Sequence, residues 1–289
     1  MAYEGFKAQV IAADVQHQLQ KALVYGQIGV TNRNYEGEVK FAKSVRIVGS
    51  GAVTVFDVTQ GSDMPDPEVV SDTEMEMTID YDKGFNFKVA KKDQAKTKID
   101  IMSEDNKEAA YAVADAVDQA VASCYINASS ANIIGTDASP KTPNVTKGDA
   151  SNIFRLITKC GTALKKSKVP TTEPKWMIIP PQFEELIVNE LHDQGASAPG
   201  VATQAVLNGS IGRIGGFDLL VSHNVPNISE TKYKVMFGTS RAITFASQVD
   251  DVRIMEMEKQ FARKVDGEYV FARKVIRPDC LGVMTCNFS

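Results

Sequence analysis

The sequence is poor in the residues that build most catalytic and metal centres. Its 289 residues include 3 His, 4 Cys and 1 Trp, and neither an H-E-x-x-H nor a G-x-S-x-G motif is present. The four cysteines form no C-x-x-C pair and are Cys124, Cys160, Cys280 and Cys286. In a reducing compartment such cysteines are expected to be buried free thiols. We therefore expect no disulfide framework, and the sequence nominates no catalytic residue, metal ligand or cofactor site.

The chain also lacks a charge excess and a long apolar run. Lys and Arg number 32 against 36 Asp and Glu, so the net charge of -4 and the pI of about 5.5 give no global attraction to nucleic acid. No stretch approaches the roughly 18 apolar residues of a membrane helix, and the start MAYEGFKAQV has no signal-peptide pattern. With 43% hydrophobic and 24% charged residues, we expect a soluble cytosolic globular protein of one or two domains.

Two glycine-rich segments resemble phosphate-binding loops only superficially. Gly49-Ser50-Gly51 follows a predicted strand, but Thr54 stands where a further glycine is needed, and a strand follows in place of a helix. A second group lacks the Lys-Ser/Thr of a P-loop and consists of Gly209, Gly212, Gly215 and Gly216. We therefore reject the first segment as a nucleotide site, and tight turns explain the second better than nucleotide binding does.

Hydrophobic periodicity predicts the elements of the first half. Apolar residues at helical spacing indicate an amphipathic helix over Phe6–Val24 and a long helix over Glu104–Asn127. Ser103 is the expected N-cap of the long helix, and its buried stripe comprises Ala110, Val113, Ala114, Val117, Val121 and Cys124. The opposite, solvent-facing side would carry Asp115, Asp118 and Gln119. Alternating or β-branched residues over Val45–Val48 and Val53–Val58 predict either two strands or one bulged strand, and further strands are predicted at Glu74–Ile79 and Gly84–Val89.

The second half begins after a polar loop at 128–148. A helix capped by Asp149 or Ser151 should carry Ile153, Leu156, Ile157, Cys160 and Leu164 on one face and end near Lys165, Lys166 and Lys168. A strand at Trp176–Ile179, a helix after Pro180-Pro181 and a strand at Asp218–Ser222 follow. In the tail, Val252–Met257 alternates, and two F-A-R-K segments flank Asp266-Gly267 as in a hairpin. Strands, then helices, then strands favour an α+β fold.

Charge is strongly segregated in one segment. Nine acids occur without any Lys, Arg or His, namely Asp57, Asp63, Asp66, Glu68, Asp72, Glu74, Glu76, Asp80 and Asp82. A lysine-rich stretch follows, with Lys83, Lys88, Lys91, Lys92, Lys96 and Lys98. Such segregation costs self-repulsion unless the acidic limb projects into solvent or meets a basic surface. It indicates either a solvated acidic loop or an extended hairpin that lies on a neighbouring subunit.

The order of several segments resembles the major capsid proteins of tailed bacteriophages, which have the Hong Kong 97-like fold. An N-terminal helix runs into a G-x-x-x-T-N-type turn and then into VRIVGSGAVTVFDV, and KEAAYAVADAVDQAVASCY is similar to the family's spine helix. LKKSKVPTTEPKWMIIPPQFEELIV, LNGSIGRIGGFDLLVSHNVP, SRAITFASQV and KVIRPDCLGVM resemble later segments in the same order. The resemblance implies that seven residues within these segments have structural roles typical of the family, namely Pro170, Pro180, Gly209, Gly212, Gly216, Phe217 and Pro278.

The resemblance implies an α+β capsid fold divided into five parts. These are an N-terminal arm (1–38), an extended loop forming a β-hairpin (39–92), a peripheral domain with the spine helix (93–147), an axial domain (148–239) and a return to the peripheral domain (240–289). The acidic segment would then reach across a neighbour. The hypothetical subunit-interface residues are Asp63, Asp66, Glu68, Asp72, Lys91, Lys92, Arg263, Lys264, Arg273 and Lys274.

The function implied by this resemblance is structural and non-catalytic, with no cofactor. Copies of the chain would form pentamers and hexamers of an icosahedral shell, mature from a procapsid and enclose double-stranded DNA through non-specific contact. Scaffolding, portal and decoration proteins are the implied partners, with assembly in the host cytoplasm, residence in the virion and no membrane contact. An encapsulin-like nanocompartment holding protein cargo and a soluble oligomeric enzyme remain the alternatives.

Overall fold

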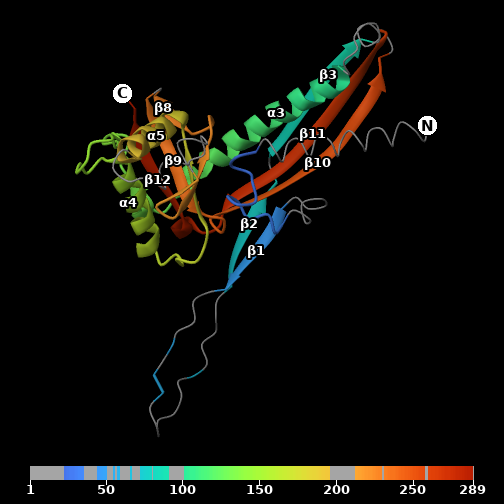
Figure 1. The fold of residues 1–289 in the computed structure, drawn as a ribbon. Coiled ribbons are helices and arrows are strands. Elements are labelled where there is room, and N and C mark those ends of the chain that lie inside the picture. Colours follow the sequence, from blue (N-terminus) through green and yellow to red (C-terminus); the bar gives the residue numbers. More distant parts are fainter. Residues whose placement is uncertain are drawn as a thin grey trace.

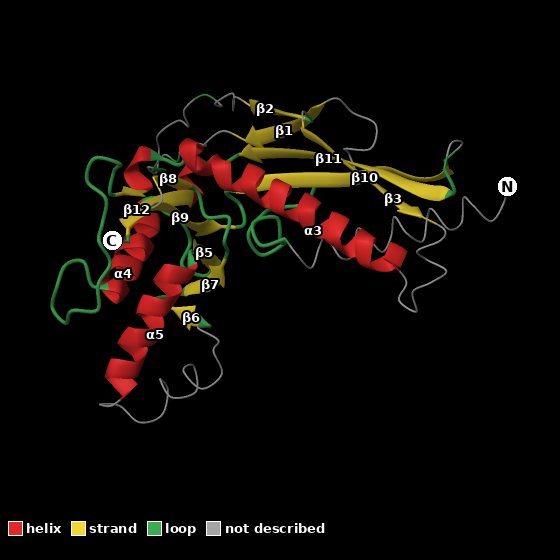
Figure 2. Ribbon diagram, turned by 90° about the horizontal axis from the view of Figure 1, so that it is seen from above, coloured by secondary structure: helices red, strands yellow, loops and turns green. Residues whose placement is uncertain are grey.

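The fold consists of an elongated lobe, a compact lobe and a projecting arm (Figures 1 and 2). It is seen in a computed structural model that describes residues 23–35, 44–50, 55, 57–58, 66, 72–79, 81–90, 101–195, 212–229, 231–257 and 260–288. The expected helix over Phe6–Val24 lies almost entirely outside these residues, and so does most of the expected strand Val53–Val58.

The elongated lobe is a three-stranded antiparallel sheet with one long helix beside it. Its strand order is β10–β11–β3, where β10 spans Ile243–Glu256, β11 spans Ala262–Val275 and β3 spans Tyr81–Ala90. Helix α3 (Ile101–Ala122) runs along this sheet, and the 3₁₀ helix Ser123–Asn127 extends it (Figure 2). The predicted apolar stripe of α3 is buried, which confirms its orientation, but the helix begins two residues before the expected cap, Ser103.

The compact lobe is a seven-stranded mixed sheet with two helices packed beside it (Figure 2). Its helices are α4 (Ile153–Lys166) and α5 (Pro181–Gly195). Its strands are β4 (Ile133–Ile134), β5 (Lys175–Ile179), β6 (Arg213–Ile214), β7 (Phe217–Val221), β8 (Asn227–Ser229), β9 (Lys232–Thr239) and β12 (Leu281–Asn287). Strands β5 and β7 are parallel and are joined across α5, whereas β9 is antiparallel to both β5 and β12.

Helix α4 is capped by a residue that the sequence analysis did not select. Asn152 is its N-cap, because the Asn152 side chain accepts a hydrogen bond of 3.1 Å from the Phe154 backbone N–H. The expected caps, Asp149 and Ser151, are therefore wrong. They lie in the turn before the helix, where the Asp149 carboxylate accepts a hydrogen bond from the Ser151 N–H. Lys165 and Lys166 occupy the last turn as predicted, where cations offset the negative end of the helix dipole.

The predicted hairpin turn at Asp266-Gly267 is wrong. Both residues lie inside the continuous strand β11, where Asp266 pairs with Asn86 of β3 and Arg253 of β10, between two antiparallel neighbours. Gly267 is required by packing rather than by a turn, because a Cβ there would lie 2.2 Å from Cζ of Phe85. The Asp266 carboxylate accepts a 2.8 Å bond from Lys264 Nζ, two residues away along the same strand.

The arm consists of β1 (Ser44–Ser50) and β2 (Asp72–Thr78), an antiparallel pair that projects from the rest of the molecule (Figure 1). Its base packs on the long sheet through a small cluster formed by Val45, Ile47, Met77, Ala246 and Ala272. This cluster is separate from the main core, which runs without a break from α3 and the long strands into α4, α5 and the compact sheet. The two lobes therefore share one hydrophobic core, and the arm does not belong to it.

Candidate functional site

A buried carboxylate ties the N-terminal segment to the long helix. Asp118 of α3 is 2% exposed and accepts backbone N–H bonds from Val24 (2.8 Å), Tyr25 (3.0 Å) and Gly26 (3.2 Å). The expectation that Asp118 faces solvent is therefore wrong. Its spacing from Ala114 and Val121, four and three residues away in the buried stripe, was the sequence signal for burial.

Burial dominates the electrostatics of this contact. Desolvation raises the pKa of Asp118 to about 6, although the three backbone N–H donors lower it and the nearby Asp115 raises it further. Asp115 is itself held by Asn224 Nδ2 at 2.7 Å and by Gln119 Nε2 at 2.9 Å. The N-terminal segment is thus fixed on α3 before it continues to Asn32, which bridges to Thr244 of β10.

Arg273 joins three elements of the elongated lobe. Its guanidinium donates to Ser123 Oγ (2.7 Å), Cys124 Sγ (3.1 Å) and Tyr81 Oη (2.9 Å), and its Cζ lies 4.8 Å from the Tyr81 ring centroid. These contacts connect β11 with β3 and with the end of the spine-like helix α3. Arg273 therefore serves the interior of one subunit, in addition to the intersubunit role predicted for it.

The other predicted basic interface residues also have partners within the chain. Lys264 pairs with Asp266, Arg263 Nε lies 3.7 Å from Glu256, and Lys274 Nζ donates to the carbonyl of Glu76 in the arm. The Lys274 contact links β11 to β2 and helps to set the direction of the arm. Lys91 and Lys92 lie outside the described residues, so the intersubunit role of the six cations stays a prediction.

The arm presents acidic and apolar side chains to solvent. Glu74 and Glu76 are exposed, and Val55 and Val58 beyond the end of β1 are 92% and 73% exposed. Asp66 is exposed and Asp72 begins β2, whereas Asp63 and Glu68 lie outside the described residues. Within the described part of the ladder, Arg46 and Glu74 form an ion pair at 4.0 Å, and both side chains are exposed. Single exposed valines are common on protein surfaces, so the projection and the acidity of this region are more informative than its apolar residues.

The glycine-rich motif packs against α4. Gly212 and Gly216 have φ values of 61° and 86°, a region that favours glycine, and they flank the strand-and-turn segment before Phe217. Phe217 is fully buried, and its ring lies so close to Gly161 of α4 that a Cβ there would be 3.4 Å from Cε2. Pro180 precedes α5, Pro170 and Pro278 line one pocket, and Gly209 lies outside the described residues.

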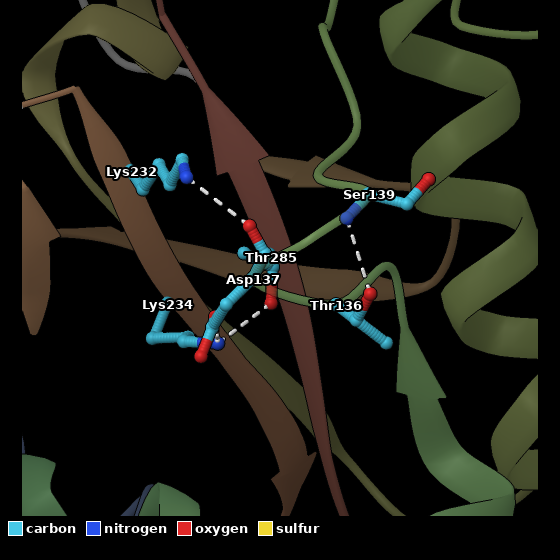
Figure 3. Close-up of polar contacts among 6 residues, drawn as sticks. All are labelled: Thr136, Asp137, Ser139, Lys232, Lys234 and Thr285. Atoms are coloured by element: carbon cyan, nitrogen blue, oxygen red, sulfur yellow. Dashed lines mark hydrogen bonds and ion pairs between the residues drawn. The ribbon is translucent and has the colours of Figure 1, made fainter.

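A buried lysine fixes a loop at the edge of the compact sheet (Figure 3). Lys234 Nζ donates to Thr285 Oγ1 at 2.9 Å and pairs with Asp137, and it lies 5.8 Å from the Tyr125 ring centroid. Lys232 Nζ donates to the Asp137 carbonyl at 3.1 Å. A lysine alternating with Tyr233 in a strand gave no sequence signal for this contact, which needs the loop and two strands to be placed together.

No reaction centre is evident in the described parts of the chain. No group of three or more His, Cys, Asp or Glu gathers there in a metal-binding arrangement, and none of the helices described is long and apolar enough to cross a membrane. All four cysteines are free and buried, as predicted. Burial raises the pKa of each thiol, so none has the lowered pKa of a reactive cysteine.

Comparison with known proteins points to one family. A family model described as phage capsid protein matches residues 74–283, which is most of the chain. A search of curated proteins finds no match.

Solved structures of phage origin share the fold. A structure from Mycobacterium phage Che8 has a TM-score of 0.71 and 22% identity, with 91% of this chain and 90% of that chain covered. The capsid of cyanophage P-SCSP1u gives a TM-score of 0.66 at 18% identity (92% and 89% covered). The capsid of Ralstonia phage GP4 gives 0.64 at 13% identity (92% and 88% covered).

Proposed function

This chain belongs to the phage capsid protein family, and on that premise we propose that it tiles with copies of itself into an icosahedral shell around packaged double-stranded DNA. Its mixed helix and sheet architecture is the Hong Kong 97-like fold that the sequence predicted, shared with capsids of tailed phages. The family consists of structural proteins of the virion shell. Pentamers and hexamers, procapsid maturation, and contact with scaffolding, portal or decoration proteins belong to the proposal.

The projecting β1–β2 arm is the observation that carries the self-assembly mechanism. The arm is joined to the body through a small cluster of its own and presents exposed acids and valines. An arm that reaches beyond its own body can bind a different surface patch on the next copy, which is a heterologous contact. Repeated contacts of this kind form a closed shell when the rotations that relate neighbouring copies add up to a closed symmetry. Each contact can be weak, because one contact brings the others to a high effective concentration.

The five-part division of the chain gives each segment a role in this proposal. The elongated lobe overlaps most of the proposed peripheral domain, residues 93–147 and 240–289, and the compact lobe most of the proposed axial domain at 148–239. The overlap is incomplete, because β4 and β12 belong to the compact sheet and β3 belongs to the elongated sheet. Residues 39–92 would form the extended loop that lies over a neighbour. The acidic average of the chain suits a container whose wall does not hold DNA tightly.

Electron microscopy of purified protein, combined with size-exclusion chromatography, tests the proposal. We expect hollow particles of megadalton mass with icosahedral symmetry when the chain is expressed with its phage assembly partners. Particles that enclose a protein cargo and no nucleic acid during infection would favour a nanocompartment instead. A persistent small oligomer under all of these conditions would contradict the shell.

A further inference from the structure

A pocket lies where the end of α4 meets the connection between β11 and β12. It has a volume of about 310 Å³ and is lined on one side by residues 167–170, on another by Glu173 and Arg241, and on the third by residues 276–280. Its charged side chains are Lys168, Arg241 and Arg277 against Glu173 and Asp279. None of these five residues belongs to the interface predicted from the sequence.

Two of its cations are unpaired within the described part of the chain. Arg241 Nη1 lies 3.1 Å from Glu173, whose side chain is only 15% exposed, so this pair is satisfied. The side chains of Lys168 and Arg277 are exposed and make no hydrogen bond or ion pair with a described residue. The pocket therefore presents two available cations beside one further acid, Asp279.

The surroundings add to this positive charge. Lys165 and Lys166 are exposed in the last turn of α4, immediately before Lys168. Lys175, two residues after Glu173, has a pKa lowered first by burial and then by the charges of Lys165 and Arg213. Lys165 and Lys166 directly precede the pocket residues 167–170 in the chain, so an anionic group would be attracted to this end of α4.

Lys168 occupies a backbone position that ordinarily takes glycine. It is the only non-glycine residue with positive φ in the described chain, at 60°, and it follows the C-cap Ser167 of α4. Glycine is the common choice there, because a side chain costs about 1 kcal/mol in this conformation. Because Lys168 carries a side chain at this cost and also lines the pocket, we assign it a role besides ending the helix.

We propose that this pocket, hereafter the basic pocket, binds carboxylates of the acidic segment (residues 57–82) of a second copy of the chain. The inference rests on the proposed shell and names the acceptor surface of its arm. The acidic segment carries nine acids and no cation, so its charge is opposite to that of the pocket, where three cations outnumber two acids. Of the six cations expected to receive it, Arg263, Lys264, Arg273 and Lys274 already have partners within the chain, and Lys91 and Lys92 lie outside the described residues.

The connection between β1 and β2 is long enough for the acidic segment to contact a neighbouring subunit. The β1–β2 ladder ends at the pair Ser50 and Asp72, already beyond the body of its own subunit (Figure 1). Residues 51–71 join these ends, and each limb of such a connection spans up to roughly 35 Å when extended. Asp63 lies two residues from the midpoint of this connection, residue 61, whereas Asp66 and Glu68 lie five and seven residues from it, so Asp63 has the longest reach of the three. A limb of that length is comparable to the roughly 30 Å diameter of a small domain, so the connection is long enough to cross part of an adjacent subunit.

Disulfide trapping in assembled particles tests the contact directly. Arg277→Cys is combined with a single Cys at position 63, 66 or 68, and the particles are oxidised and analysed on non-reducing gels. At least one pair should give ladders of linked subunits, because a disulfide requires Cα atoms within about 7 Å. Arg277→Cys alone is the control for the native thiols. Intact particles without any linkage at the three positions would overturn the proposal.

Charge exchange provides a second test with a rescue. Lys168→Glu with Arg277→Glu should raise the protein concentration needed for assembly by about tenfold, because the lost contact recurs throughout the shell. Adding Asp66→Lys and Glu68→Lys in the same chain should restore assembly. Lys147→Glu with Lys159→Glu, which reverses two exposed cations outside the pocket, is the matched control. Failure of the rescue with a folded monomer would contradict the pairing.

Lys168→Gly separates the docking role from the folding role. It removes the ammonium group while relieving the positive-φ strain, so the monomer should melt at a higher temperature while assembly weakens. A variant that is more stable and assembles normally would contradict the docking role. Normal assembly with loss of packaged DNA would show that the pocket binds phosphate instead. If the unmodified chain forms no shell, the proposed function fails first, independently of the pocket.

Discussion

At the scale of single residues, Asp118 is the side chain on which the N-terminal segment depends most. Replacing it with Ala removes the acceptor of three backbone N–H groups that are wholly or partly buried. We expect a loss of at least about 3 kcal/mol in the free energy of unfolding, since each unpaired buried donor costs about 1–3 kcal/mol. Urea denaturation of the unassembled subunit measures this loss.

The matched control for Asp118→Ala is Glu108→Ala, which removes an exposed carboxylate from the same helix. Glu108→Ala should change the stability by less than about 0.5 kcal/mol. Hydrogen exchange adds a local readout, because the amides of Val24, Tyr25 and Gly26 should exchange faster only in the Asp118 variant. Equal protection of these amides in both variants would contradict the contact.

The same carboxylate predicts a pH dependence of stability. Its pKa of about 6 in the folded chain exceeds the value near 3.9 of an unfolded Asp, so folding takes up a proton between these values. The stability that this group contributes is therefore full below pH about 4 and is lost as the pH rises through about 6. Asp118→Asn should remove this trend.

The measurement is the difference in unfolding free energy between the unmodified chain and Asp118→Asn at several pH values. Because other acids titrate equally in both proteins, the difference isolates Asp118. Between pH 4 and pH 7 the unmodified chain should lose up to about 3 kcal/mol of unfolding free energy relative to Asp118→Asn. A difference that stays constant across this range would show that the folded and unfolded pKa values are the same.

Gly267 allows a sharp test of strand packing. Its φ is not positive, so Gly267→Ala is destabilising because of the Phe85 ring and not because of the backbone. We expect a loss of about 1–3 kcal/mol, measured by denaturation. Gly84→Ala is the matched control on the paired strand, since its Cβ would meet only the Gly267 carbonyl at 3.7 Å. In a Phe85→Ala background the cost of Gly267→Ala should largely disappear.

At the scale of elements, the acidic segment should be needed for assembly and not for folding. Asp63→Lys, Asp66→Lys and Glu68→Lys together should prevent particle formation while the circular dichroism and melting temperature of the subunit stay unchanged. Neutralisation to Asn, Asn and Gln is the graded control and should have a smaller effect, because it removes attraction without adding repulsion. Normal particles from the reversed variant would remove the segment from the interface.

Elements with a clear hydrophobic period could be predicted from the sequence. The stripe of α3, the buried face of α4, and the strands β2, β3, β5 and β7 lie where the periodicity put them. Errors arose where a local signal was overruled by distant packing. Asp266-Gly267 has the composition of a turn, yet it is a mid-strand pair because β3 and β10 flank it and Phe85 fills the space above the glycine.

The contacts at the candidate site needed the folded chain. Asp118 lies 92–94 residues from its backbone donors, and Lys234 lies 97 residues from Asp137, so no local pattern could pair them. The basic pocket likewise combines the end of α4 with a connection more than a hundred residues later. Charge segregation was visible in the sequence, but which cations remain available after folding was not.

At the scale of the whole molecule, assembly should depend on salt. A contact between the acidic segment and the basic pocket is screened as the Debye length falls from about 10 Å at 0.1 M to about 3 Å at 1 M. Light scattering should therefore show slower assembly at high salt for the unmodified chain. The charge-exchanged chain should show the same sensitivity, and the chain with only its pocket reversed should assemble faster as salt rises. If the assembly rates of the unmodified, charge-exchanged and pocket-reversed chains were all independent of salt concentration, the contact would not be electrostatic.

The single core that runs through both lobes has a mechanical consequence. A body held together by continuous side-chain packing resists bending, whereas the arm is joined to the body by a small separate cluster centred on Val45, Ile47, Met77, Ala246 and Ala272, together with the bond from Lys274 to the Glu76 carbonyl. Curvature differences between neighbouring places in a closed surface must then be absorbed at that small joint. The body would then act as a rigid unit, and the flexibility of the joint between arm and body would limit the curvature of the shell.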